Sequence, residues 1–161
     1  MSDFALSWSL SRKRFLDEVA GLSSTQLNYK IHENCLSIGE MALHVAGVEI
    51  MFGSQIAGLQ LTDFEQRVRR AATEGVVDDL PFPFSREEIT PELVDTSLEA
   101  SRTIWEPLIT NPTIELRAVE LKSALGPMIS GEGAFTRLGF HSAYHQGQAH
   151  LIKTSPGFPS S

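Results

Sequence analysis

A chain of 161 residues, 42% hydrophobic and 20% charged, has the size and composition of one globular domain, which we expect to span residues 1–161. Its formal net charge of −7 argues against nucleic acid as a partner, because phosphate binding depends on clustered lysine and arginine. We expect neither a signal peptide nor a membrane-spanning segment, and the single cysteine, Cys35, cannot form an intramolecular disulfide. These features predict a cytoplasmic protein in which Cys35 is structural rather than a nucleophile.

The first predicted element is a helix from Phe4 to Ala20. Its aromatic and aliphatic residues recur at helical spacing and would face a core. The basic run from Arg12 to Arg14 is expected to face water. Gly21 then supplies a helix stop.

A second long helix is predicted from Ser37 to Ala57. Ser37 is a good N-cap, and Glu40 three residues later completes the spacing of a capping box. Gly58 is expected to end this helix. A shorter helix is predicted from Asp63 to Thr73.

The segment 75–89 contains Pro81 and Pro83, which exclude a regular helix. One interpretation is a surface crossover between two helices. The other is a lid that supplies Phe82 and Phe84 to the mouth of an active site. We favour the crossover, because loops of this length are often only connections.

Two more long helices complete the predicted fold. Thr90 followed by Pro91 predicts the start of a third helix, which we expect to end near Pro107. Residues 111–129 predict either a short strand pair or an irregular crossover. The apolar residues that would form the strands are Ile114, Leu116, Val119 and Leu121. A fourth helix is predicted from Ser130 to Thr154, so the elements together indicate an all-α fold.

The fourth helix carries His141 and His145, which lie four residues apart in an apolar seam. On a helix this spacing puts two rings roughly 40° apart in projection and about 6 Å apart along the axis, so both can reach one transition-metal ion. Buried imidazoles need partners, because unpaired polar groups are costly in a core. On this pair alone, a metal site and two hydrogen-bonded core histidines are equally good interpretations.

A third histidine favours the metal site. His44 also takes a core position, on the second helix, and a stable divalent site usually needs at least three protein ligands. His150 projects about 180° from His141 on the same helix, and His32 lies in a polar connection, so neither is expected to bind. Histidines on the core faces of both helices predict that the second and fourth helices face each other.

Three motifs follow one another along the chain. They are Leu22 to Leu27, Ser37 to Glu40 running into His44, and His141 to His145 followed by Gly147-Gln148. In this order they resemble the DinB/YfiT-like superfamily of metalloenzymes, over nearly the whole chain. The resemblance implies an antiparallel four-helix bundle with long crossover loops. It also implies that the three histidines bind a divalent metal, zinc or nickel.

The chain departs from the family pattern at two positions. Many members carry a histidine and an arginine where this chain has Tyr144 and Gln146. The three metal ligands are unaffected, whereas substrate contacts made at those two positions are not implied for this chain.

Three neutral imidazoles leave an open coordination position, which is typical of catalytic rather than structural sites. No glutamate lies between the two histidines of the fourth helix, so the zincin motif is absent. The candidates for an acid or a base are Tyr144, Glu49 and Tyr29. Glu49 is a weak candidate, because it lies about 140° around the second helix from His44.

Two hypotheses for the function follow. In the first, the protein is a metal-dependent enzyme acting on a small molecule, either a hydrolase or a low-molecular-weight-thiol-dependent transferase or isomerase, as some relatives in the superfamily are. In the second, it is a non-catalytic bundle that binds a metal or a small ligand. We expect a homodimer in either case. An open site facing a solvent-connected pocket would favour the enzyme.

Overall fold

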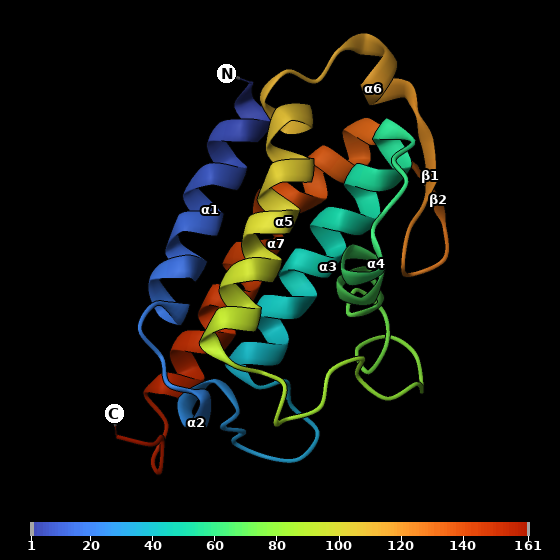
Figure 1. The fold of residues 1–161 in the computed structure, drawn as a ribbon. Coiled ribbons are helices and arrows are strands. Elements are labelled where there is room, and N and C mark those ends of the chain that lie inside the picture. The colour runs from blue at the N-terminus through green and yellow to red at the C-terminus, as the bar shows by residue number, and fades with distance from the viewer. Residues whose placement is uncertain (1, 161) are drawn as a thin grey trace.

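The computed structural model describes residues 2–160 and is mainly helical, as predicted (Figure 1). Its long helices are α1 (Asp3–Val19), α3 (Ile38–Ala57), α5 (Pro91–Thr110) and α7 (Gly131–Lys153). The connections contain the short helices α2 (Ser24–Leu27), α4 (Asp63–Arg70) and α6 (Ile114–Ala118). Strands β1 (Glu120–Lys122) and β2 (Met128–Ser130) form an antiparallel hairpin just before α7. No helix within residues 2–160 is both long and apolar enough to cross a membrane.

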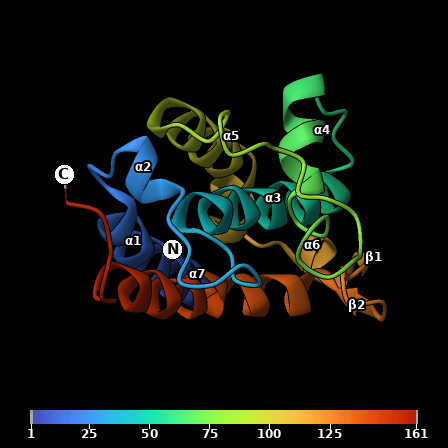
Figure 2. The ribbon, with the colours of Figure 1, turned by 90° about the horizontal axis from the view of Figure 1, so that it is seen from below.

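The long helices pack in two pairs, α1 with α7 and α3 with α5, and α3 also packs against α7 (Figure 2). Ser7 of α1 contacts Gly139 of α7, and Glu18 contacts His150, so α1 and α7 run in the same direction. Figure 1 shows α1 and α7 running down the page while α3 and α5 run up it. Because α3 and α5 also share a direction, residues 58–90 must return the chain along the length of the molecule.

The predicted helix starts are confirmed by their hydrogen bonds. The Ser37 N–H donates to Glu40 Oε2 at 2.7 Å, and Ser37 Oγ accepts from the Glu40 N–H at 3.2 Å, which completes the capping box. Gly58 follows α3 with a φ of 62°, a left-handed conformation that glycine adopts without steric cost. Thr90 caps α5, and Pro91 is its first residue.

Two predictions about the second half of the chain differ from the structure in detail. The third long helix, expected to end near Pro107, ends at Thr110; because Pro107 lies in its last turn, the missing N–H removes only one intrahelical bond. Ile114 and Leu116 lie in α6 rather than in a strand, since Thr113 Oγ1 accepts from the Leu116 N–H at 3.3 Å and caps a helical turn. Leu121 does lie in β1, so the predicted strand pair exists but is shorter.

The connection 75–89 supplies aromatic side chains to the core. Phe84 is 4% exposed, and the guanidinium of Arg67 lies 4.3 Å from the centroid of its ring. Phe82 is partly buried and packs against the same core. The hypothesis that Phe82 and Phe84 form a lid is therefore wrong, because both rings are already used in packing.

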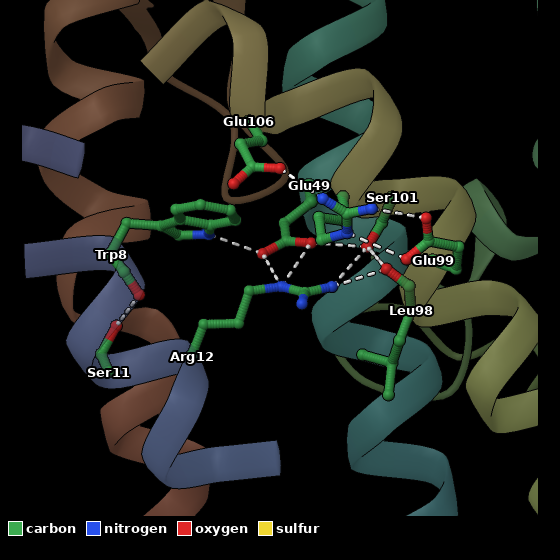
Figure 3. A network of polar contacts seen from close by, with 9 residues as sticks. Trp8, Ser11, Arg12, Glu49, Leu98, Glu99, Ser101 and Glu106 are labelled. Atoms are coloured by element: carbon green, nitrogen blue, oxygen red, sulfur yellow. Dashed lines mark hydrogen bonds and ion pairs between the residues drawn. The ribbon is translucent and has the colours of Figure 1, made fainter. Parts of the chain in front are cut away.

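Arg12 lies inside the protein, so the prediction that it faces water is wrong (Figure 3). Its Nε donates to Glu49 Oε1 at 3.1 Å, and its Nη2 donates to the Leu98 carbonyl at 2.6 Å. Glu49, which is 1% exposed, also accepts from Trp8 Nε1 at 2.8 Å and from the Ser101 hydroxyl at 2.5 Å. A buried carboxylate on α3 thus gives the guanidinium the partner that burial requires, and the network joins α1, α3 and α5.

Replacing Glu49 with alanine would leave the Arg12 guanidinium buried without its counter-ion. We expect Glu49→Ala to lower the free energy of unfolding by about 3–5 kcal/mol, the usual cost of removing one partner of a buried ion pair. Asp17→Ala is the matched control, because it breaks the exposed Lys13–Asp17 pair on α1 and should leave stability near wild type. Urea denaturation measures both, and equal losses would contradict a structural role for Glu49.

Candidate metal centre

The three predicted ligands come together between α3 and α7. His44 comes from α3, and His141 and His145 come from successive turns of α7. His141 Nε2 lies 3.2 Å from His44 Nε2 and 3.2 Å from His145 Nε2. His44 and His145 are buried and His141 is partly buried, so three ring nitrogens meet at the edge of the core.

Hydrogen bonds orient two of the three rings. His44 Nδ1 lies 2.9 Å from the carbonyl oxygen of Ala71, and His145 Nδ1 lies 2.8 Å from Gln148 Oε1. An oxygen of either kind can only accept, so Nδ1 carries the proton in both rings and Nε2 presents its lone pair. Partners of this kind fix the tautomer and the orientation of a ligating histidine.

Gly47 allows the Ala71 carbonyl to approach His44. A Cβ atom added at Gly47 would lie 2.6 Å from the Val68 carbonyl oxygen and 2.8 Å from the Ala72 nitrogen. Only glycine therefore lets the backbone after α4 pack directly on α3. This close approach brings the Ala71 carbonyl within reach of the His44 ring one helical turn earlier.

The arrangement fits a divalent transition-metal ion. With zinc–nitrogen bonds of about 2.0–2.1 Å, two nitrogens of a tetrahedral site lie about 3.3–3.4 Å apart, close to the 3.2 Å found for both pairs. The ligand nitrogens of all three rings lie within 4.8 Å of one another. Neutral imidazole suits zinc and nickel, and three such ligands leave a further position open.

Burial keeps the three rings neutral. Desolvation lowers the pKa of His44, and it lowers the pKa of His145 to about 4. Desolvation, followed by the proximity of the other two rings, holds the pKa of His141 well below its usual range. At neutral pH an incoming cation therefore has few protons to displace from the site.

A cavity of about 570 Å³ lies beside the three histidines and is lined mainly by apolar side chains. Phe140 and Tyr144 line it with 59% and 62% of their surface exposed, so the cavity is open to solvent. The volume lies within the usual range for small-molecule sites. A ligand in this cavity would reach the nitrogen cluster without rearrangement of the core.

Of the three acid or base candidates, the structure places one at the site. Tyr144 lines the cavity, and its ring meets that of His145 edge-on at 5.1 Å. Glu49 does not line the cavity, because its side chain belongs to the network with Arg12. Tyr29 is also remote, since its hydroxyl donates to the Pro156 carbonyl at 3.1 Å. Glu49 and Tyr29 therefore lie away from the three histidines.

The residues expected to lie outside the site do so. His150 Nδ1 lies 3.2 Å from Glu18 Oε1 near the surface, and His32 is exposed. Cys35 does not line the cavity, and its thiol donates to the carbonyl of His32 at 3.1 Å. His150, His32 and Cys35 therefore take no part in the cluster of three histidines.

Sequence reasoning missed one charged residue of the site and two supporting groups. Arg137 lines the cavity one helical turn before His141, and its spacing of four residues could have identified it. Gln148 was recognised only as part of a motif, although it orients His145. The Ala71 carbonyl carries no side-chain signal, so the sequence could not have revealed it.

Comparisons with known proteins support the fold and leave the function open. No family model matches the chain, and no curated protein matches it. Among solved structures, a conserved protein from Enterococcus faecalis is similar, with a TM-score of 0.67 and 14% sequence identity. The similarity covers 93% of this chain and 92% of that one. At this identity the likeness shows a shared fold alone.

Acid should lower the free energy of unfolding of the metal-free protein at pH values above those at which surface carboxylates take up protons. The unfolded chain binds protons at histidine near pH 6.5, whereas folded His145 binds one only near its pKa of about 4. Between these values the unfolded state binds more protons, so stability is complete above pH 6.5 and falls as the pH drops toward 4. For His145 alone the loss should reach roughly 3 kcal/mol.

Urea denaturation of metal-free protein between pH 7 and pH 4 measures this loss. His145→Gln should show a shallower fall than wild type, because it removes one buried titrating ring. His32→Gln is the control and should follow the wild-type curve, since that side chain is exposed. Identical pH profiles for wild type and His145→Gln would mean that burial does not hold this ring neutral.

Proposed function

We propose that the protein is a metal-dependent enzyme in which His44, His141 and His145 hold a divalent ion, zinc or nickel. The observation that carries this proposal is the convergence of three imidazole Nε2 atoms beside a solvent-open cavity. α3 packs against α7, and the three motifs follow one another along the chain in the order typical of the superfamily. Both observations support a four-helix bundle of the DinB/YfiT-like type.

When bound, a divalent ion would supply Lewis acidity at the cavity wall. The residues of the chain prepare that position. Ala71 and Gln148 hold the protons of two rings on Nδ1, so that both Nε2 atoms remain available. The apolar lining excludes water around a bound ligand, which strengthens electrostatic interactions there. Tyr144 is the phenol on the wall and is our candidate for holding or moving a proton.

The candidate reactions remain hydrolysis and the transfer or isomerisation of a thiol-linked small molecule. Non-catalytic binding of a metal or small ligand is the second candidate, and one observation favours it. No aspartate or glutamate lines the cavity within residues 2–160, so a carboxylate base is absent from the wall. Screening zinc-loaded protein for ester hydrolysis and for thiol-dependent reactions distinguishes the two, since only the enzyme turns over substrate.

Single substitutions of the five histidines test the metal site. Most of the bound zinc or nickel should be lost in each of His44→Ala, His141→Ala and His145→Ala, because the two remaining imidazole ligands bind a divalent ion only weakly. His150→Ala and His32→Ala are matched controls and should keep the wild-type stoichiometry. Elemental analysis of the purified variants measures the metal, and circular dichroism checks that each is folded.

The helices should survive loss of the metal, because the apolar core supplies most of the stability. A folded His44→Ala protein with wild-type metal content would contradict the proposal, as would loss of metal in His150→Ala.

A further inference from the structure

The cavity beside the histidines differs in charge from the rest of the protein. The chain has a formal net charge of −7, yet no acidic side chain of residues 2–160 lines this cavity. With the three imidazoles neutral, Arg137 is the charged residue on its wall. A basic group in an acid-free apolar pocket, next to a site for a divalent cation, favours an anionic ligand.

Arg137 is held in place but makes no ion pair among the described residues. Its Nη1 donates to Ser123 Oγ at 2.8 Å, and Ser123 is a buried residue of the β1–β2 hairpin. By contrast, Arg12, Arg67, Arg102 and Arg117 each contact a glutamate. A guanidinium has five N–H donors in a planar fork that matches a carboxylate, so Arg137 keeps donors for a ligand.

Helix geometry relates Arg137 to the metal ligands. Arg137, His141 and His145 follow one another at intervals of four residues, and all three line the cavity. Successive positions in such a row are about 6 Å apart along the helix axis. An anionic group at Arg137 would therefore lie about one helical turn from the position that the three histidines surround.

The remaining wall is suited to an apolar body. Val48, Met51, Phe52 and Leu138 form buried parts of the lining, all from α3 and α7. At the mouth, Val77 and Leu125 are 45% and 72% exposed, and Phe140 is also largely exposed. Large apolar side chains that crowd an open pocket are the surface that a bound apolar group would cover.

We propose that the cavity binds an apolar small molecule carrying one carboxylate, with the carboxylate on Arg137 and Ser123. The apolar body lies along the α3 and α7 walls, and the group to be acted on lies about one helical turn from the carboxylate, at the three histidines. A single guanidinium balances one negative charge, which favours a monoanion over a phosphate dianion. The placement of the reacting group at the three histidines rests on the proposed metal-dependent function, whereas the contact between the carboxylate and Arg137 does not.

Calorimetric titration with octanoate and 1-octanol tests the proposal on both zinc-loaded and metal-free protein. Octanoate should bind wild type, and Arg137→Gln should weaken it about tenfold or more in both forms, because a charge-assisted contact is lost. Arg137→Lys keeps the positive charge but lacks the planar fork of donors. Its affinity for octanoate should lie between those of wild type and Arg137→Gln. 1-Octanol has no charge and should bind wild type and Arg137→Gln alike.

Arg14→Gln is the matched control, because it removes the same charge from an exposed position on α1 and should leave octanoate binding unchanged. Equal octanoate affinity in wild type and Arg137→Gln would overturn the proposal. So would equal weakening in Arg14→Gln, which would indicate a general charge effect. Loss of octanoate binding in His145→Ala, which should retain little zinc, but not in Arg137→Gln would also overturn it, by placing the carboxylate on the ion.

The same samples distinguish failure of this inference from failure of the proposed function. If wild type retains no zinc or nickel but Arg137→Gln still weakens octanoate, the metal-dependent function fails and the carboxylate contact stands. Thermal unfolding of each variant without ligand confirms that the compared proteins are folded.

Discussion

Three imidazoles buried side by side must find partners for their nitrogens, and much of the structure around α3 and α7 serves this requirement. The Ala71 carbonyl and the Gln148 amide oxygen satisfy Nδ1 of His44 and His145. These bonds leave a lone pair on Nε2 of both rings. Lone pairs that lie close together repel each other unless a positive group lies between them. A cation would satisfy all three Nε2 atoms at once, and this supports our proposal of a metal site over a hydrogen-bonded core.

The second buried polar network fixes how α3 presents the ring of His44. Glu49 lies about 140° around α3 from His44, so the carboxylate faces Arg12 and Ser101 while the imidazole faces α7. A rotation of α3 would break the ion pair or withdraw His44 from its partners. α3 is also buried around nearly its whole circumference, as expected for a helix surrounded by others. The position of His44 is therefore set from two sides.

The sequence predicted those features that depend on local chemistry. The capping box at Ser37 and the start of α5 at Thr90 follow from side chains a few residues from the groups they satisfy. The ligand pair on α7 follows from helical periodicity, and His44 from its place on an apolar seam. These signals lie within one helix, and sequence alone carries them.

Features that depend on contacts between distant segments were missed. Arg12 was assigned to water because its partner, Glu49, lies on another helix, and a charge pattern on one helix does not show that partner. The shared direction of α3 and α5 depends on how the chain from 58 to 90 returns, which no local motif specifies. The role of the Ala71 carbonyl depends on the close packing at Gly47, a tertiary contact.

The most direct test of the central claim is the position of the metal in crystals of zinc-loaded protein, located by anomalous diffraction at the zinc edge. The account predicts a peak about 2.0–2.1 Å from Nε2 of His44, His141 and His145, with Nδ1 of His44 and His145 still bonded to Ala71 and Gln148. A peak at His32 or His150, ligation through Nδ1, or no peak between α3 and α7 would contradict it.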